Sequence, residues 1–248
     1  MPVSEALGTA RERLAFALDY PNLDAARRGA ELVSESVGVL KVGLELFVRS
    51  GPAAVHLGHE LCCDVFLDLK LHDIPETVER AVAAACEHGA RYLTLHASGG
   101  PSMLEAAARR AERENTGLVL LAVTVLTSLD ASDLTAIGFQ RPPAEQALML
   151  ARLAQSAGVR GAVCSVAEVA ALRAQLGKDA VLVTPGIRPR DGNASDDQKR
   201  VGTPGDAIRS GSSILVVGRP IRDATDPKLA AARVLAEISE ASGESVTS

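Results

Sequence analysis

Residues 65–78 have the sequence VFLDLKLHDIPETV, an apolar run that leads through a polar turn into the start of a helix. Residues 65–69 form a short apolar stretch of the kind found in strands that are buried on both faces. Pro75 occupies a position where prolines begin helices, and apolar residues then recur at helical spacing from Val78 to Ala85. The stretch therefore predicts a strand followed by a helix, the repeating unit of parallel α/β folds.

The same unit recurs along the whole chain. Most of the other apolar runs of strand length are followed by a helical pattern, and they occupy residues 14–18, 39–42, 92–95, 118–125, 162–164, 181–183 and 214–217. Eight such units predict a single-domain α/β protein, a (β/α)8 TIM barrel over residues 1–248, with frayed ends at about residues 1–12 and 240–248. The alternative is a doubly wound open sheet, and the first expected strand lacks the GxGxxG motif of its dinucleotide-binding form.

Composition narrows the class of function. Hydrophobic residues make up 47% of the chain and charged residues 23%, which indicates a globular protein rather than a disordered or fibrous one. The net charge of -5 and the 2% aromatic content disfavour binding to nucleic acid or to an anionic membrane. No apolar run is long enough to span a bilayer, and the first residues lack a signal-peptide pattern. Because the four cysteines have no zinc-ligand spacing, a cytoplasmic location with idle thiols is expected.

Charged residues follow the expected strands at the end where barrel enzymes carry out their chemistry. Asp68 and Lys70 are two apart, so strand alternation aims both into the barrel mouth. Lys41 ends the second strand and Asp73 follows the third, and the four residues can form one cluster of alternating charge. An ion-pair network that only stabilises the barrel is the alternative, but desolvation often cancels the gain of such pairs. Neighbouring carboxylates instead favour a charged Lys70 that can donate a proton.

The loops after the seventh and eighth expected strands predict an anion site. In barrels of this type these loops often bind phosphate. Arg188 and Gln198 lie in the first loop, and Gly218 and Arg219 follow the last strand. Glycine allows the backbone N–H to approach an oxyanion, and arginine can bind one with two hydrogen bonds. The alternative at each of the two places is a solvated loop without a ligand. His96, at the end of the fourth expected strand, is a separate candidate, and it could equally contact a ligand or only cap the strand.

Seven motifs in order make the chain resemble a known family. They are FALDYP (16–21), LKVGLELF (40–47), FLDLKLHDIPETV (66–78), VTVLTSL (123–129), TPGIRP (184–189), DDQKRVGTP (196–204) and VVGRPI (216–221). Together they resemble the bacterial orotidine 5′-phosphate decarboxylase family, and the resemblance covers nearly the whole chain. It implies a lyase that converts orotidine 5′-phosphate to UMP in the last step of de novo pyrimidine synthesis. It further implies a homodimer with active sites at the interface, and no metal or organic cofactor.

The resemblance also implies a role for each site residue. Lys70 would donate a proton to C6 of the pyrimidine as CO₂ leaves, and Asp68 would lie beside the substrate carboxylate. The other implied contacts are Asp73 and Thr77 reaching in from the partner subunit, Asp19 and Lys41 at the ribose, Thr127 and Ser128 at the pyrimidine, Arg188, Gln198, Gly218 and Arg219 at the phosphate, and Pro185 in the loop that closes over it.

Two rival functions remain. A Mg²⁺-dependent decarboxylase or aldolase for keto-sugar phosphates shares the Asp-x-Lys-x-x-Asp pattern, but it uses a Glu where this chain has Lys41, whose charge repels a cation. A non-catalytic nucleotide-binding barrel would keep the phosphate residues and lose the charged ones, whereas this chain has both sets.

Overall fold

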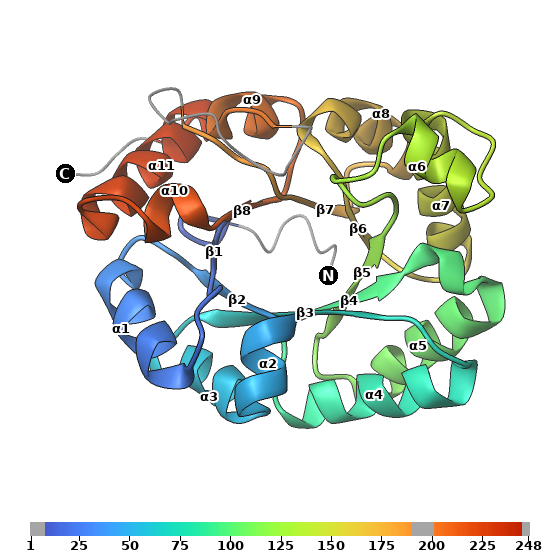
Figure 1. Ribbon diagram of the computed structural model, residues 1–248, viewed down its shortest axis with the longest axis horizontal. Helices are drawn as coiled ribbons and strands as arrows, with labels where there is room; N and C mark the ends of the chain where they lie inside the picture. Colours follow the sequence, from blue (N-terminus) through green and yellow to red (C-terminus); the bar gives the residue numbers. More distant parts are fainter. Residues whose placement is uncertain (1–7, 190–200, 245–248) are drawn as a thin grey trace.

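A computed structural model describes residues 8–189 and 201–244. Within these residues eight parallel strands pair in sequence order, and the last pairs with the first, so that the sheet closes into a barrel (Figure 1). This confirms the predicted (β/α)8 barrel and excludes the open sheet. The strands are β1 (Leu14–Ala17), β2 (Val39–Gly43), β3 (Asp64–Leu71), β4 (Tyr92–His96), β5 (Val119–Val123), β6 (Gly161–Val163), β7 (Val181–Thr184) and β8 (Ile214–Val217).

Helices cover the outside of this barrel (Figure 1). Two helices connect β2 to β3 and two connect β5 to β6, and a single 3-10 turn precedes the helix after β4. The helical elements in the described residues are α1 (Leu23–Val33), α2 (Leu44–Ser50), α3 (Ala53–Glu60), α4 (Pro75–Glu87), η2 (Ala97–Gly99), α5 (Pro101–Glu114), α6 (Ala131–Ala136), α7 (Pro143–Ser156), α8 (Val166–Leu176), α9 (Pro204–Arg209), α10 (Arg219–Arg222) and α11 (Pro227–Ser242).

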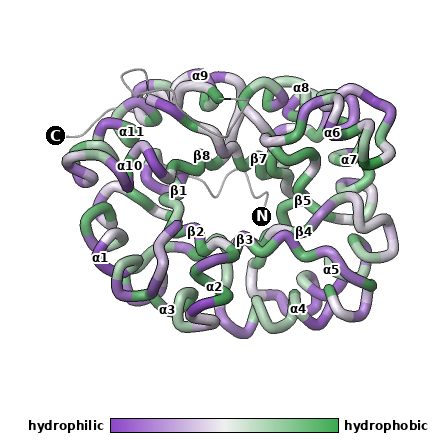
Figure 2. Tube along the Cα trace, in the orientation of Figure 1, coloured by the Kyte–Doolittle hydropathy of each residue, from purple (hydrophilic) through white to green (hydrophobic). Residues whose placement is uncertain are grey.

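Strand alternation divides the core into two layers. On β1, Leu14 and Phe16 belong to the large cluster between strands and helices, whereas Ala15 and Ala17 belong to a second cluster inside the barrel. Both faces of β1 and of most other strands are therefore buried, which explains why the strands are largely continuous apolar runs rather than alternating ones. Figure 2 shows this as green strands within a ring of helices that also have purple segments.

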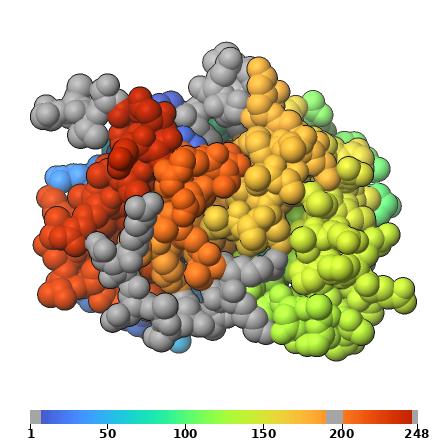
Figure 3. All heavy atoms as spheres, turned by 90° about the horizontal axis from the view of Figure 1, so that it is seen from above, coloured from blue at the N-terminus to red at the C-terminus, as the bar shows by residue number. Residues whose placement is uncertain are grey.

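The helices α9 and α11, which follow the last strands, each begin with a capping side chain. The Thr203 side chain accepts a hydrogen bond from the Asp206 N–H at the start of α9, and Asp226 accepts one from the Leu229 N–H at the start of α11. In each case proline occupies the first helical turn. Figure 3 shows the face that these helices form, with α9 in orange between the yellow α8 and the red α11.

Two arginines brace the amino-terminal end of the barrel. Arg173, on α8, donates hydrogen bonds to the carbonyl oxygens of Ala180 (2.8 Å) and Gly211 (2.8 Å) and to the Ser213 hydroxyl (3.0 Å). Arg13 donates to the carbonyl oxygen of Ser213 at 3.3 Å. These bonds join the segments that precede β1, β7 and β8, because backbone groups at this end have no strand partner of their own.

The described parts of the two chain ends pack against the barrel. Ala10 is buried, and its N–H donates a hydrogen bond to the Glu244 carboxylate at 2.9 Å. Helix α11 continues to Ser242. The fraying expected for residues 1–12 and 240–248 therefore does not extend to these described residues, because each end supplies the other with a partner.

Candidate active site

A cavity of about 220 Å³ opens at the carboxyl ends of the strands. It lies where the sequence predicted the site, because loops at this end can vary without disturbing the packed barrel. Nine of the predicted residues line it: Asp19, Lys41, Asp68, Lys70, Thr127, Pro185, Arg188, Gly218 and Arg219.

Four of these residues form a chain of alternating charge, named here the charged cluster: Asp19, Lys41, Asp68 and Lys70. The Lys41 Nζ lies 3.2 Å from Asp19 Oδ1 and 3.9 Å from Asp68 Oδ2. The Lys70 Nζ donates a hydrogen bond to Asp68 Oδ1 at 2.8 Å. The side chains of Lys41 and Asp68 are only 12% and 15% exposed, so their charges are held largely away from water. Such a cluster stabilises a barrel poorly and fixes charges in a low-dielectric site, where they act strongly on a ligand.

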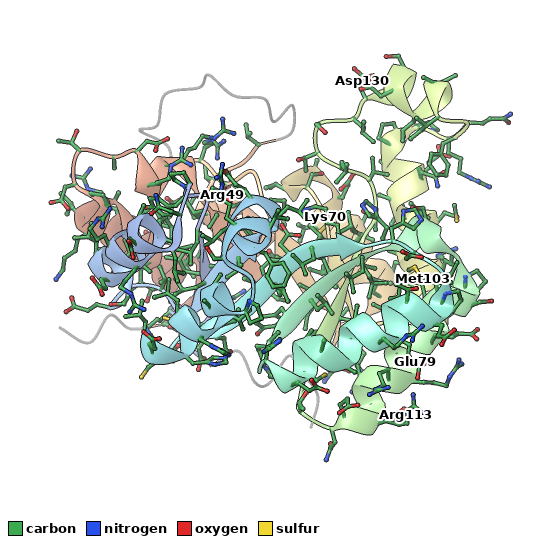
Figure 4. All side chains as sticks on the ribbon, turned by 60° about the horizontal axis from the view of Figure 1, so that its bottom comes forward. Arg49, Lys70, Glu79, Met103, Arg113 and Asp130 are labelled. Atoms are coloured by element: carbon green, nitrogen blue, oxygen red, sulfur yellow. The ribbon has the colours of Figure 1, made fainter. Side chains whose placement is uncertain are left out.

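Lys70 itself has a strained backbone. Its φ angle is 53°, in the left-handed region that costs a residue with a side chain roughly 1–2 kcal/mol. The β3–β4 register shifts at the same place, since Leu67 pairs with Leu93 but Leu71 pairs with Leu95. Both side chains reach the cavity, as the alternation argument predicted, although that argument did not predict the interruption of the β3–β4 ladder. Figure 4 shows Lys70 on β3 toward the middle of the molecule, whereas Glu79 and Arg113 lie on the outer helices α4 and α5.

Arg188, Gly218 and Arg219 also line the cavity. Gly218 and Arg219 lead from β8 into the short helix α10, and Arg188 follows β7. The loop after β7 is closed at its base, because the Arg188 N–H donates to the Gly202 carbonyl at 2.9 Å and the Gly202 N–H donates to the Gly186 carbonyl at 3.2 Å. Gln198, the other predicted phosphate contact, lies outside the described residues.

Three predicted residues do not line this cavity. Ser128 follows Thr127 and is exposed. Asp73 and Thr77 are exposed, one at the turn before α4 and the other in its first turn, and Asp73 lines a separate, more open hollow. The expected cluster of four is thus wrong for a single chain, because Asp19 and not Asp73 completes it. The turn after β3 carries Asp73 away from the mouth of its own barrel.

His96 lies beside the cluster, at the end of β4. The centroid of its ring is 5.3 Å from that of His72. Burial above all, followed by the positive charge of His72 and Lys70, lowers the pKa of His96 from its usual value of 6.5. The ring is therefore neutral near pH 7, and it adds no positive charge next to Lys70.

Sequence reasoning missed Thr94 and the apolar wall of the cavity. Thr94 is 1% exposed on β4 and hydrogen-bonds to both Asp68 and Lys70. A usable signal was present, because a polar residue inside a buried strand needs a partner. The wall was harder to foresee, since apolar residues of the barrel interior look alike in sequence; it includes Phe66, Val123, Val163, Val183 and Val216.

The described residues contain neither a metal-binding cluster nor a membrane-spanning helix. No group of three or more His, Cys, Asp or Glu side chains there is arranged to hold a metal ion. No helix within residues 8–189 and 201–244 has the length and apolar content that a membrane crossing requires.

The closed barrel and the charged cluster at its carboxyl end define a (β/α)8-barrel enzyme. The chain belongs to the Orotidine 5'-phosphate decarboxylase / HUMPS family, whose model matches residues 12–234. This confirms the resemblance that the seven motifs indicated.

Known relatives agree over nearly the full length. The chain is 54% identical over 225 residues to the orotidine 5'-phosphate decarboxylase of Anaeromyxobacter sp. (strain K), which covers 91% of this chain and 97% of the relative. It is 52% identical over 229 residues to that of Chromohalobacter salexigens, at 92% and 97% coverage. The crystal structure of orotidine 5'-phosphate decarboxylase from Lactobacillus acidophilus superposes with a TM-score of 0.79 at 35% identity, and the match covers 92% of this chain and 99% of that one.

Proposed function

We propose that this enzyme converts orotidine 5′-phosphate to UMP and CO₂, the last step of de novo pyrimidine synthesis, with Lys70 as the proton donor. The observation that supports these roles best is the charged cluster, which ends at the strained Lys70 inside a cavity that also contains Arg188 and Arg219. The family and its named relatives support the reaction, which makes the enzyme a carbon–carbon lyase.

The chemistry needs a fixed cation. When the bond from C6 to the carboxylate breaks, its electron pair stays on C6, and the substrate offers no group that can absorb it. The ammonium of Lys70 stabilises this developing charge electrostatically and then transfers a proton to C6, which yields UMP. Asp68 holds the ammonium through the 2.8 Å hydrogen bond. A cation fixed before the reaction does not have to be reorganised during it.

In this proposal the loops after β7 and β8 bind the phosphate. Arg188 and Arg219 supply charge, and Gly218 lets the backbone approach the oxyanion. Gln198, which lies outside the described residues, remains a predicted phosphate contact. Asp19 and Lys41 bind the ribose hydroxyls, and Thr127 and Ser128 contact the pyrimidine. Pro185, in the loop after β7, lines the cavity. Binding energy from these distant contacts supports the reaction at C6 by holding the substrate against Lys70.

The proposed enzyme is a homodimer in which each site takes residues from both chains. Asp73 and Thr77 are exposed and lie outside the cavity of their own chain, which suits residues that serve a partner. Apolar residues at the same end of the barrel are exposed too: Ile74 is 64% exposed before α4, and Val48 is 81% exposed on α2. A second copy would cover these side chains, as homodimer interfaces do.

The thiols support a cytoplasmic location for this reaction. None of the four cysteines, all of which lie in the described residues, forms a disulfide, and three of them, Cys63, Cys86 and Cys164, are buried. Free thiols persist in reducing compartments, where disulfides are rare.

The charged cluster also bears on the Mg²⁺-dependent alternative. The ammonium of Lys41 lies 3.2 Å from Asp19 and 3.9 Å from Asp68, so the carboxylates that a cation would need already have a cationic partner. A divalent ion at this place would be repelled by Lys41.

Turnover by the purified chain tests the proposal. Loss of orotidine 5′-phosphate is followed by ultraviolet absorbance with and without EDTA, and EDTA-resistant formation of UMP is expected. Lys70→Ala should abolish turnover and still bind UMP, while Lys228→Ala, which loses only an exposed ion pair with Glu35, serves as the control. Turnover by Lys70→Ala near the wild-type rate would refute the role of Lys70. UMP binding by the wild-type chain without turnover would indicate a non-catalytic binder, and EDTA-sensitive activity on keto-sugar phosphates would indicate the Mg²⁺ enzyme.

A further inference from the structure

Thr94 connects the two residues at the centre of the charged cluster. Its hydroxyl accepts a hydrogen bond from the Lys70 backbone N–H at 2.9 Å and donates one to Asp68 Oδ1, also at 2.9 Å. The same Asp68 oxygen accepts the hydrogen bond from Lys70 Nζ at 2.8 Å. Lys70 is therefore tied to one carboxylate oxygen at both ends, directly through its ammonium and indirectly through its backbone.

The position of Thr94 explains why the backbone of Lys70 needs this bond. Between the pairs Leu67–Leu93 and Leu71–Leu95, β3 has more residues than β4, so the regular ladder is interrupted. A buried N–H that loses its ladder partner must find another acceptor. Thr94 lies on β4 within this interruption, and its side chain supplies that acceptor in place of a backbone carbonyl.

The bond also opposes the relaxation of a strained residue. Lys70 has φ 53°, whereas an ordinary residue of a parallel strand has φ near about −120°. Release of the N–H would allow a rotation of roughly 170° toward that value and would redirect the whole side chain. The Asp68 carboxylate would lose one of its two short contacts at the same time, since Oδ1 is the atom that both Thr94 and Lys70 contact.

We propose that Thr94 is a positioning residue, which holds the Lys70 backbone in its left-handed conformation and the Asp68 carboxylate in its orientation, so that the ammonium points to the reacting carbon. This inference rests on the proposed role of Lys70. Thr94 does not line the cavity and need not touch the substrate. It acts on the rate through the geometry of two other residues.

A graded set of variants separates this role from simple packing. Thr94→Val keeps the shape and removes the hydroxyl, Thr94→Cys replaces it by a weaker hydrogen-bonding group, and Thr94→Ser keeps it. The matched control is Thr184→Val. Thr184 is 0% exposed on a barrel strand and shares a 2.7 Å hydrogen bond with Ser212, so its variant loses a buried hydroxyl bond without touching the charged cluster.

Steady-state kinetics with orotidine 5′-phosphate provide the first measurement. Thr94→Val should lower kcat by about 10²-fold with a smaller change in KM, because a displacement of about 1 Å at a reacting group has an effect of this size. The kcat of Thr94→Cys should lie between those of Thr94→Val and Thr94→Ser, and the cysteine variant tests the inference even if the valine variant does not fold. Thr94→Ser and Thr184→Val should keep kcat within about threefold of the wild type.

Amide hydrogen exchange at Lys70 provides a second measurement that does not depend on turnover. Thr94→Val and Thr94→Cys should speed exchange at this amide by about tenfold or more, while the amides of β1 and β8 keep their rates. A kcat of Thr94→Val and Thr94→Cys equal to that of Thr184→Val, or unchanged exchange at the Lys70 amide in these two variants, would overturn the inference. A wild-type chain without turnover would instead overturn the proposed function, and the inference about positioning would be lost with it.

Discussion

Mixing two inactive variants tests the shared active site. In the proposed dimer, each site combines Lys70 of one chain with Asp73 of the other. Asp73→Asn removes the charge that reaches the partner, and Asn can still accept the hydrogen bond that Asp73 Oδ1 accepts from the Ile74 N–H at 2.6 Å. Lys70→Ala removes the proton donor. Each homodimer should therefore be inactive for a different reason.

The expected recovery follows from the geometry. A heterodimer of the two variants contains one site with both defects and one site with an intact Lys70 and an intact Asp73. Isolated heterodimers should thus show about half of the wild-type activity per dimer. In an unfractionated equimolar mixture only half of the dimers are heterodimers, so the activity should be about a quarter of the wild type.

The assay uses two affinity tags, one on each variant, to isolate the heterodimer, and ultraviolet absorbance to follow orotidine 5′-phosphate. A heterodimer of wild-type and Lys70→Ala chains is the control and should also retain about half of the activity, whether or not sites are shared. The result that refutes the reasoning is an inactive heterodimer of the two variants beside a half-active control. Asp73 would then act in its own chain, although it lies outside that cavity.

Three further predictions concern Arg219 at the proposed phosphate site, Arg173 at the amino-terminal end of the barrel, and the half-buried His96. Arg219→Ala should raise KM by at least about tenfold, since a charged hydrogen bond contributes roughly 1.5–3 kcal/mol, and an unchanged KM would contradict a phosphate contact. Arg173→Met should lower the unfolding midpoint by roughly 6–12 °C and leave kcat unchanged, because charged hydrogen bonds to Gly211, Ala180 and their neighbours worth about 3 kcal/mol are lost. A shift under about 2 °C in calorimetry would contradict this. The pKa of His96 is lowered in the folded state, so below about pH 6.5 the unfolded chain binds more protons and the stability of the fold decreases. The Tm of His96→Asn should therefore fall less than the Tm of the wild type when the pH is lowered from about 7.5 to about 5.5. An equal fall in both proteins would contradict the assignment.

The strands were predictable because the barrel buries both of their faces. All eight expected runs differ from the observed strands by at most two residues at either end. The run at residues 118–125 extends two residues too far, since β5 ends at Val123 and the Thr124 hydroxyl donates to the Val163 carbonyl at 3.2 Å. Apolar content alone does not reveal such an end, because Val125 remains buried beyond the strand.

The place of the site was predictable for a similar reason. Polar residues such as Asp19 and Arg219 directly follow apolar strands, and all carboxyl ends meet at one side of a parallel barrel. The conformation of Lys70 was not predictable in this way. Its left-handed backbone depends on a hydroxyl from β4, 24 residues later in the chain, and local patterns contain no information on such a pairing. The position of Asp73 likewise depends on the turn that follows.

The strained Lys70 and the two stabilising arginines lie at opposite ends of the barrel, and this separation links stability to function. At the amino-terminal end, Arg173 and Arg13 satisfy backbone carbonyls with charged hydrogen bonds. At the carboxyl end, a lysine with positive φ opposes folding, and the largely buried Asp68 gains little net stability from its ion pairs. A strained residue of this kind persists only if the surrounding structure determines its conformation, and the packed strands between the two ends provide that support. The reactive geometry is therefore a property of the whole barrel. Variants of Arg13 and Arg173 should lower the stability of the fold while the catalytic rate stays unchanged.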